Sequence, residues 1–115
     1  METNKYDVTI GIPMYNAADF IQRTMESALS QTYDNIEFLV VDDGSTDNSV
    51  QKLNTIKDAH PRGGDIRLIT LSDNQGPSYV RNLIIEKAQG YFLYFMDADD
   101  LIRKDTISLM MYYVH

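Results

Sequence analysis

The 115-residue sequence contains no cysteine and no long apolar run. Without cysteine there can be no disulfide and no thiolate ligand for a metal ion, which is typical of cytoplasmic proteins. The longest apolar stretch, residues 91–96, is the size of a strand and far short of the roughly 18 residues of a membrane span. No basic and then apolar leader opens the chain. We therefore expect a cytoplasmic location with no membrane span in this segment, and a place at the membrane surface in a longer form of the protein.

Basic residues are scarce as well. The chain has 10 lysines and arginines against 17 aspartates and glutamates, which gives a net charge of -7 at pH 7. This charge would repel nucleic-acid phosphates, so we expect no nucleic-acid partner. The length allows one domain at most, and the hydrophobic content of 43% is that of a folded domain. An acidic domain that binds a phosphorylated ligand needs a local cation.

Short apolar runs alternate with segments of helical spacing. The runs of strand length are residues 8–12, 36–41, 66–71 and 91–96. Helical spacing follows in residues 20–29, 50–53, 80–88 and from Arg103 onwards. Asn16 is the predicted N-cap of the first helix, residues 45–47 carry capping residues for the second, and residues 60–65 are predicted to form a plain surface turn. The order predicts an α/β fold, a Rossmann-like and mostly parallel sheet with helices on both faces.

The carboxyl ends of the predicted strands are where an open parallel sheet binds its ligands. Two of these ends are densely acidic, with Asp42 and Asp43 after the second run and Asp97, Asp99 and Asp100 after the fourth. Five carboxylates on one rim repel each other, so we expect something to compensate them.

The pair Asp97 and Asp99 predicts a metal site. Mg²⁺ and Mn²⁺ prefer carboxylate oxygens, and Mg²⁺ is commonly held by one or two carboxylates together with substrate phosphates. Two aspartates at alternate positions can reach one ion if the chain turns at the strand end. The alternative is a solvated acidic turn that caps the following helix.

Other residues at the same rim suit a nucleotide. A carboxylate of Asp42 or Asp43 could accept a hydrogen bond from an imide N–H such as that of uracil, or this segment could simply form a turn. Tyr15 offers a ring on which a base can stack, or is a half-buried loop aromatic. Arg81 could contact a phosphate, or be an exposed helical arginine beside an acid.

Seven segments together resemble the family 2 glycosyltransferases of the GT-A fold. They are residues 10–16, 30–33, 36–47, 73–76, 81–82, 88–91 and 97–100, in the order and spacing of that family. The resemblance implies a nucleotide-diphospho-sugar donor, usually UDP-linked, a Mn²⁺ or Mg²⁺ ion, and a carbohydrate or lipid-linked acceptor in bacterial polysaccharide biosynthesis. The site residues that it implies are Pro13 and Tyr15 at the base, Asp42 and Asp43 as base-reading carboxylates, Arg81 near the nucleotide, and Asp97 and Asp99 as the metal motif, with Asp97 also at the substrate.

The sequence departs from the family at two positions and in length. Val80 stands where the family often has alanine, and Ile84 where a small residue is usual. Family members are longer, so we expect residues 1–115 to be the N-terminal nucleotide-sugar-binding part of a GT-A domain. The resemblance places the acceptor site and the catalytic base beyond residue 115. We therefore expect a metal-dependent, inverting enzyme whose 115-residue portion binds donor without completing transfer.

Rival functions fit the sequence less well. A P-loop protein or a dinucleotide dehydrogenase needs a glycine-rich phosphate loop, and neither motif is present. A receiver domain would carry its acidic pair after the first strand, and a phosphatase with an Asp-x-Asp nucleophile would carry it on an early strand. The alternative that remains is a non-catalytic sugar-nucleotide-binding module. The last predicted helix carries more apolar residues than one buried face requires, so we also expect a homodimer.

Overall fold

The computed structural model describes residues 5–114, and these residues alternate between strands and helices. The strands are β1 (Tyr6–Met14), β2 (Ile36–Asp42), β3 (Ile66–Thr70) and β4 (Gly90–Phe95). The helices are α1 (Ile21–Leu29), α2 (Ser49–Ala59), the short 3-10 helix η1 (Gly63–Asp65), α3 (Pro77–Lys87) and α4 (Thr106–Val114). The predicted order of elements is confirmed.

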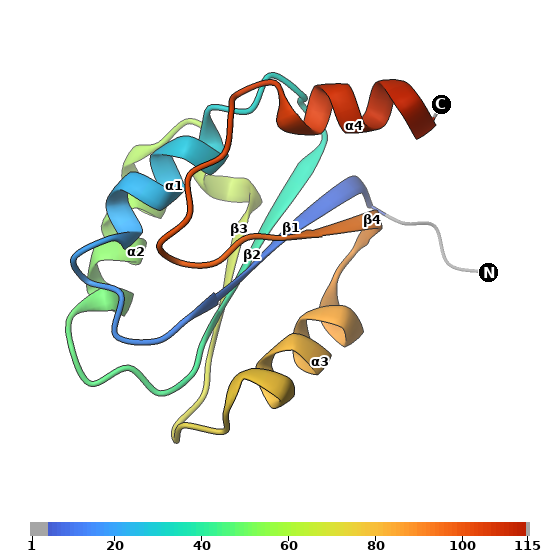
Figure 1. Cartoon of the computed structure of the whole chain (residues 1–115). Coiled ribbons are helices and arrows are strands. Elements are labelled where there is room, and N and C mark those ends of the chain that lie inside the picture. The colour runs from blue at the N-terminus through green and yellow to red at the C-terminus, as the bar shows by residue number, and fades with distance from the viewer. Residues whose placement is uncertain (1–4, 115) are drawn as a thin grey trace.

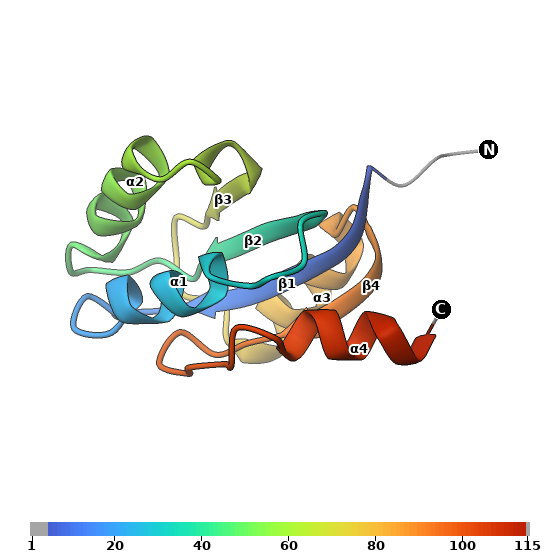
Figure 2. The same ribbon diagram turned by 90° about the horizontal axis from the view of Figure 1, so that it is seen from above.

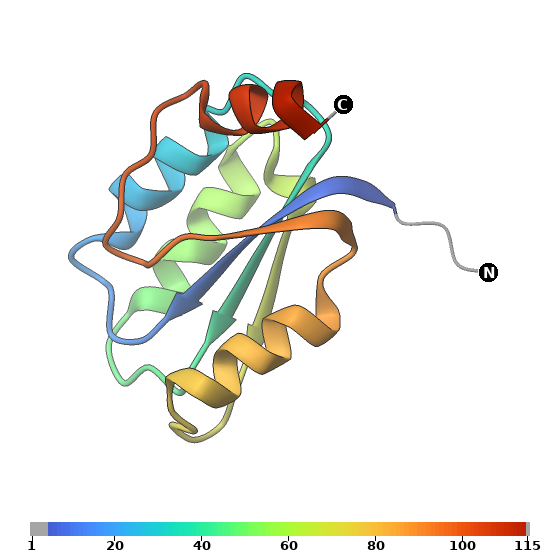
Figure 3. The ribbon, with the colours of Figure 1, turned by 45° about the vertical axis from the view of Figure 1, so that its right-hand side comes forward.

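All four strands run parallel in one sheet of order β3-β2-β1-β4. The two longest strands, β1 and β2, lie in the middle, and every residue of β2 is buried. This burial explains why residues 38–41 form an apolar run without polar alternation. Because the strands are parallel, the loops that follow them gather at one edge of the sheet, toward which the arrowheads point in Figure 3. The predicted ligand edge is therefore a real edge of the molecule.

Helices cover both faces of the sheet, which confirms the predicted Rossmann-like α/β architecture. Helices α1, α2 and α4 pack on one face, where their apolar side chains join those of β1 and β2 in the larger core. Helix α3 lies alone on the other face, as Figures 1 and 2 show, and its Val80 and Ile84 pack against Leu39 and Val41 of β2. No helix within residues 5–114 has the length and hydropathy needed to cross a membrane.

The close packing of α3 depends on a glycine in β1. A Cβ atom added at Gly11 would lie 2.5 Å from the Cγ2 atom of Ile84, far inside van der Waals contact. The absence of a side chain in the strand thus makes room for the large side chain in the helix. Ile84, one of the two departures from the family pattern, fills this space and is fully buried.

Three local predictions were wrong. Asn16 does not cap α1, which begins at Ile21, and it has a positive φ of 49° instead. The fourth helix begins at Thr106 rather than near Arg103, because the chain after β4 first runs across α1. The turn at residues 60–65 is not plain, since it contains η1 and the Arg62 guanidinium that contacts the end of α1.

Candidate functional site

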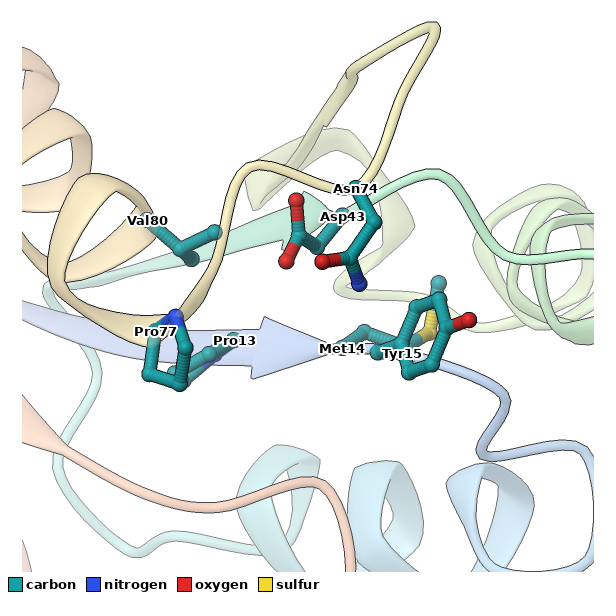
Figure 4. A pocket seen from close by; sticks show the side chains of 7 residues that line it. All are labelled: Pro13, Met14, Tyr15, Asp43, Asn74, Pro77 and Val80. Atoms are coloured by element: carbon teal, nitrogen blue, oxygen red, sulfur yellow. The ribbon is translucent and has the colours of Figure 1, made fainter.

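A cavity of about 310 Å³ lies at the carboxyl edge of the sheet, between the ends of β1 and β2 and the start of α3. Its lining residues are Pro13, Met14, Tyr15, Asp43, Asn74, Pro77 and Val80. Figure 4 shows Asp43 and Asn74 across the cavity from Pro13 and Tyr15. The lining is mostly apolar with a few polar groups, which is the composition of a small-molecule site.

Asp43 connects three loops at this edge. Its backbone N–H donates to the Met14 carbonyl at 2.8 Å, and its carboxylate accepts the N–H groups of Gln75 at 2.6 Å and Gly76 at 3.1 Å. The side chain is 5% exposed, so these two donors compensate most of the cost of burying the charge. Each carboxylate oxygen has a second lone pair, and Asp43 can therefore accept one more hydrogen bond from a ligand in the cavity.

The backbone beside Asp43 requires glycine. Gly44 has a φ of 74°, and a Cβ atom there would lie 2.8 Å from the carbonyl carbon of Asp73 and 2.9 Å from the nitrogen of Asn74. The loop after β3 thus packs directly on the loop after β2, which brings Asn74 to the cavity wall.

A second cavity, of about 290 Å³, lies on the other side of Tyr15. It is lined by Pro13, Tyr15, Asn16, Ala17, Phe20, Asp97, Ala98 and Asp99. Pro13 and Tyr15 line both cavities, so the Tyr15 ring, 48% exposed, separates an apolar chamber from an acidic one. One ligand could extend from one chamber to the other past this ring.

Three exposed aspartates form a cluster after β4. One carboxylate oxygen each from Asp97, Asp99 and Asp100 lie within 4.8 Å of one another. The Asp97 N–H donates to the Asp100 carboxylate at 3.0 Å, which turns the chain so that these side chains converge. Oxygen ligands at this spacing, open to solvent, fit a Mg²⁺ or Mn²⁺ ion that shares its coordination with a phosphate.

Two predicted site residues line neither cavity. Asp42 is 3% exposed, and its carboxylate accepts both the N–H of Ser45 at 3.1 Å and its hydroxyl at 2.5 Å. Arg81 is exposed, with its guanidinium 4.1 Å from the centre of the Phe95 ring. The structure thus brings Pro13, Tyr15 and Asp43 together in the first chamber, and Asp97 and Asp99 face Tyr15 in the second.

Sequence reasoning missed several residues of this edge. Asn74 and Pro77 also line the first chamber, and Pro77 is the first residue of α3. Asp100, which the sequence placed on the acidic rim but not in the metal motif, joins Asp97 and Asp99 in the acidic cluster. Phe20 was assigned to the apolar side of the first helix, yet it precedes α1, is 43% exposed and lines the second chamber.

Side chains of the loop after β2 also contact the loop after β1. The Asp47 carboxylate accepts the hydroxyl and the N–H of Ser49, and also the N–H of Ala18 at 3.1 Å. The Ser49 hydroxyl is the main cause of a lowered Asp47 pKa, to which these N–H donors add. The carboxylate is therefore ionised at neutral pH and ties the two loops together.

Comparison with known proteins identifies relatives of this chain. The family model described as glycosyl transferase family 2 matches residues 9–115. An uncharacterized glycosyltransferase of Haemophilus influenzae is 41% identical over 101 residues, which cover 88% of this chain and 39% of that protein. The Escherichia coli UDP-Glc:alpha-D-GlcNAc-diphosphoundecaprenol beta-1,3-glucosyltransferase WfaP is 38% identical over 109 residues, or 93% of this chain and 41% of WfaP. The chain thus spans about two fifths of the length of these curated relatives.

Solved glycosyltransferase structures have the same fold. Staphylococcus aureus TarS 1-349 in complex with UDP-GlcNAc superposes with a TM-score of 0.86 at 28% identity, covering 94% of this chain and 31% of that one. The mannosyltransferase PcManGT from Pyrobaculum calidifontis, in complex with GDP-Man and Mn²⁺, superposes with a TM-score of 0.87 at 26% identity, covering 97% of this chain and 33% of that one. The resemblance read from the sequence is confirmed, and the chain belongs to glycosyl transferase family 2.

Proposed function

We propose that this chain binds a nucleoside-diphosphate sugar, with uridine as the nucleoside, in the groove formed by the two chambers at the carboxyl edge of the sheet. The observation that carries the proposal is that Pro13 and Tyr15 line both chambers. A base in the apolar chamber is then joined through its ribose to a diphosphate in the acidic one. The names of the relatives support uridine, since WfaP is a UDP-Glc enzyme and TarS binds UDP-GlcNAc.

The base contacts follow from the first chamber. The exposed ring of Tyr15 offers a flat apolar face, on which a base gains stacking energy. Asp43 lies across the chamber and retains acceptor capacity for the imide N–H of uracil. A carboxylate fixed by two backbone N–H groups is already oriented for this contact, so little ordering entropy is lost on binding.

The diphosphate contacts follow from the second chamber. Asp97 and Asp99 would hold a Mn²⁺ or Mg²⁺ ion together with Asp100, whose carboxylate completes the cluster. When bound there, such an ion stabilises the negative charge that gathers on a diphosphate leaving group. Without a cation, these exposed carboxylates would repel the diphosphate.

In the complete protein we expect this donor site to serve the transfer of the sugar to a carbohydrate or lipid-linked acceptor, with inversion at the anomeric carbon. The relative WfaP is by name a glucosyltransferase with a diphosphoundecaprenol-linked acceptor, which supports a lipid-linked acceptor here. The base that deprotonates the acceptor hydroxyl is still predicted to lie beyond residue 115. Donor binding is therefore the property that the described residues can be tested for.

Calorimetric titration with UDP, with and without Mn²⁺, tests the proposal. UDP affinity should rise when Mn²⁺ is present, and Asp99→Ala should remove this dependence. Asp58→Ala is the matched control, because Asp58 is also an exposed aspartate but lies on α2, outside both chambers. Equal UDP affinity with and without the metal would refute the metal bridge, and a wild-type protein that binds no UDP would refute the proposed function.

A further inference from the structure

The Tyr15 side chain is not held by its own polar atom. Within residues 5–114, no hydrogen bond is formed by its hydroxyl, although the ring is nearly half exposed between two chambers. Its direction must therefore be set by the backbone. Both peptide groups that flank Tyr15 are fixed to the loop after β2, because the Met14 carbonyl accepts the Asp43 N–H at 2.8 Å and the Asn16 N–H donates to the Ser45 hydroxyl at 2.9 Å.

The next two peptide groups are fixed in the same way. The Ala17 N–H donates to the Ser49 hydroxyl at 2.8 Å, and the Ala18 N–H donates to the Asp47 carboxylate at 3.1 Å. Three consecutive backbone donors of the loop after β1 are thus bound by side chains of the loop after β2 and of the first residue of α2. Tyr15 lies in a loop, and the contacts that hold the backbone after it come from residues about 30 positions further along the sequence.

Asn16 returns the contact in the opposite direction. Its amide oxygen accepts the N–H groups of Thr46 at 2.8 Å and Asp47 at 3.3 Å. To do so it adopts a φ of 49°, the left-handed region, and it is the one residue other than glycine with a positive φ in the described part of the chain. Asparagine tolerates this region better than most residues, but the conformation still costs energy that only the surrounding contacts can offset.

Asp42 orients the Ser45 hydroxyl for its contact with the Asn16 N–H. Its carboxylate accepts both the N–H and the hydroxyl of Ser45, and the hydroxyl oxygen is then oriented to accept the Asn16 N–H. Asp42 is buried and lines neither chamber, so the role that the structure gives its carboxylate is to orient the Ser45 hydroxyl. The chain of contacts runs from a buried strand end, through a hydroxyl, to the peptide group beside the stacking ring.

We propose that Asn16 is a positioning residue, which acts with Ser45 and Asp42 to hold the Tyr15 ring against the nucleotide base. The inference rests on the proposed function, because it assigns Tyr15 to the base. The left-handed Asn16 sets the direction in which the chain leaves Tyr15, and its amide oxygen locks that direction to the neighbouring loop. A loop that merely needed stability could use the same contacts without any energetic coupling to Tyr15, and this is the difference that an experiment can measure.

A double-mutant cycle on UDP affinity measures that coupling. The four proteins are wild type, Asn16→Gly, Tyr15→Ala and the double variant, titrated with UDP in the presence of Mn²⁺. Asn16→Gly tolerates the positive φ and removes the whole side chain, so it deletes the contacts of the amide oxygen without straining the backbone. The acidic cluster still binds the diphosphate in Tyr15→Ala, so the affinity of every variant can be measured. Asn35→Gly, at an exposed loop asparagine outside both chambers, is the matched control.

We expect Asn16→Gly to weaken UDP binding about tenfold, the scale of a lost base–aromatic contact, and to have less than about twofold effect when Tyr15 is already alanine. Thermal unfolding of each variant identifies any that fail to fold, and Ser45→Ala, which removes only the hydroxyl, then takes the place of Asn16→Gly in the cycle. Equal losses in both backgrounds, or no loss, would refute the positioning role alone. A wild type that does not bind UDP would refute the proposed function as well.

Discussion

Replacing Arg62 by alanine tests how the face of the sheet that carries α1 is held together. The Arg62 guanidinium donates to four carbonyls at the end of α1 and in the following loop, those of Leu29, Gln31, Tyr33 and Asp34, at 2.9–3.2 Å. It also lies 5.1 Å from the centre of the Phe38 ring. The last carbonyls of a helix have no partner within it, and Arg62 supplies a donor to that of Leu29, while its other three bonds hold the loop that follows α1.

The magnitude follows from these contacts. A hydrogen bond from a charged donor contributes about 1.5–3 kcal/mol, and bonds that share one side chain are not additive. Counting the two bonds of 2.9 Å alone gives at most about 3–6 kcal/mol, a large part of the roughly 5–15 kcal/mol that stabilises a domain. Arg62→Lys should lose less, because an ammonium still donates but cannot reach all four carbonyls.

Urea denaturation of purified variants measures this loss of unfolding free energy. Arg103→Ala is the matched control, since Arg103 forms an exposed ion pair with Asp105 at 3.1 Å. Such pairs contribute less than about 1 kcal/mol. If Arg62→Ala lowers the unfolding free energy no more than the control does, the guanidinium does not stabilise the end of α1. Should Arg62→Ala fail to fold, the Arg62→Lys value decides the question, and equality with wild type would refute the reasoning.

Three further predictions concern other contacts. Burial, reinforced by the hydrogen bond to Asp65, raises the pKa of Tyr6 from 10.0 to about 12. The stabilisation that the neutral Tyr6 hydroxyl provides is therefore complete below pH 10 and is lost as the pH rises toward 12. In denaturation assays over this range, Tyr6→Phe should lose less unfolding free energy than the wild type. Gln31→Leu should lower the unfolding free energy by about 2–3 kcal/mol, because the buried Gln31 amide donates to the Arg103 carbonyl and accepts the Ile107 N–H. The control Thr32→Val removes an exposed contact and should lower the unfolding free energy by less than about 0.5 kcal/mol. Tyr112 and Tyr113 are 76% and 81% exposed on α4, and replacing both by serine should weaken the predicted self-association in sedimentation velocity, which a strictly monomeric wild type would contradict.

The strands were predictable because their signal is local. Within the predicted strand at residues 36–41, residues 38–41 are all apolar, and a run of this kind between turn residues favours a buried strand. Once four such runs are placed in parallel, the edge on which Tyr15 and Asp43 lie follows from topology alone. The general position of the candidate site was therefore contained in the pattern of the sequence.

The contacts within the site were not predictable in the same way. Asn16 looked like an N-cap because it precedes a helical pattern, but its amide oxygen binds N–H groups 30 and 31 residues further along the chain. Arg62 lies in a segment that reads as a turn, and its partners lie 28 to 33 residues earlier. Such contacts form only where loops from distant parts of the sequence pack against each other. The local hydrophobic periodicity carries no information about this packing.

The carboxylates of the acidic rim fall into two groups that differ in how their charge is compensated. Five carboxylates were predicted to require compensation. Asp42 obtains it from the Ser45 N–H and hydroxyl, and Asp43 from two backbone N–H groups of the loop before α3. Neither of these buried carboxylates needs a cation.

The requirement for a cation is therefore confined to the cluster after β4. Within the described residues, the carboxylates of Asp97, Asp99 and Asp100 accept one hydrogen bond, that from the Asp97 N–H to Asp100. These carboxylates are exposed, so water can compensate them until a ligand arrives. Under the proposed function, a diphosphate entering the second chamber would displace that water and add its own negative charge, and a divalent ion would then be needed to compensate it. Metal and donor should accordingly bind together, each raising the affinity of the other.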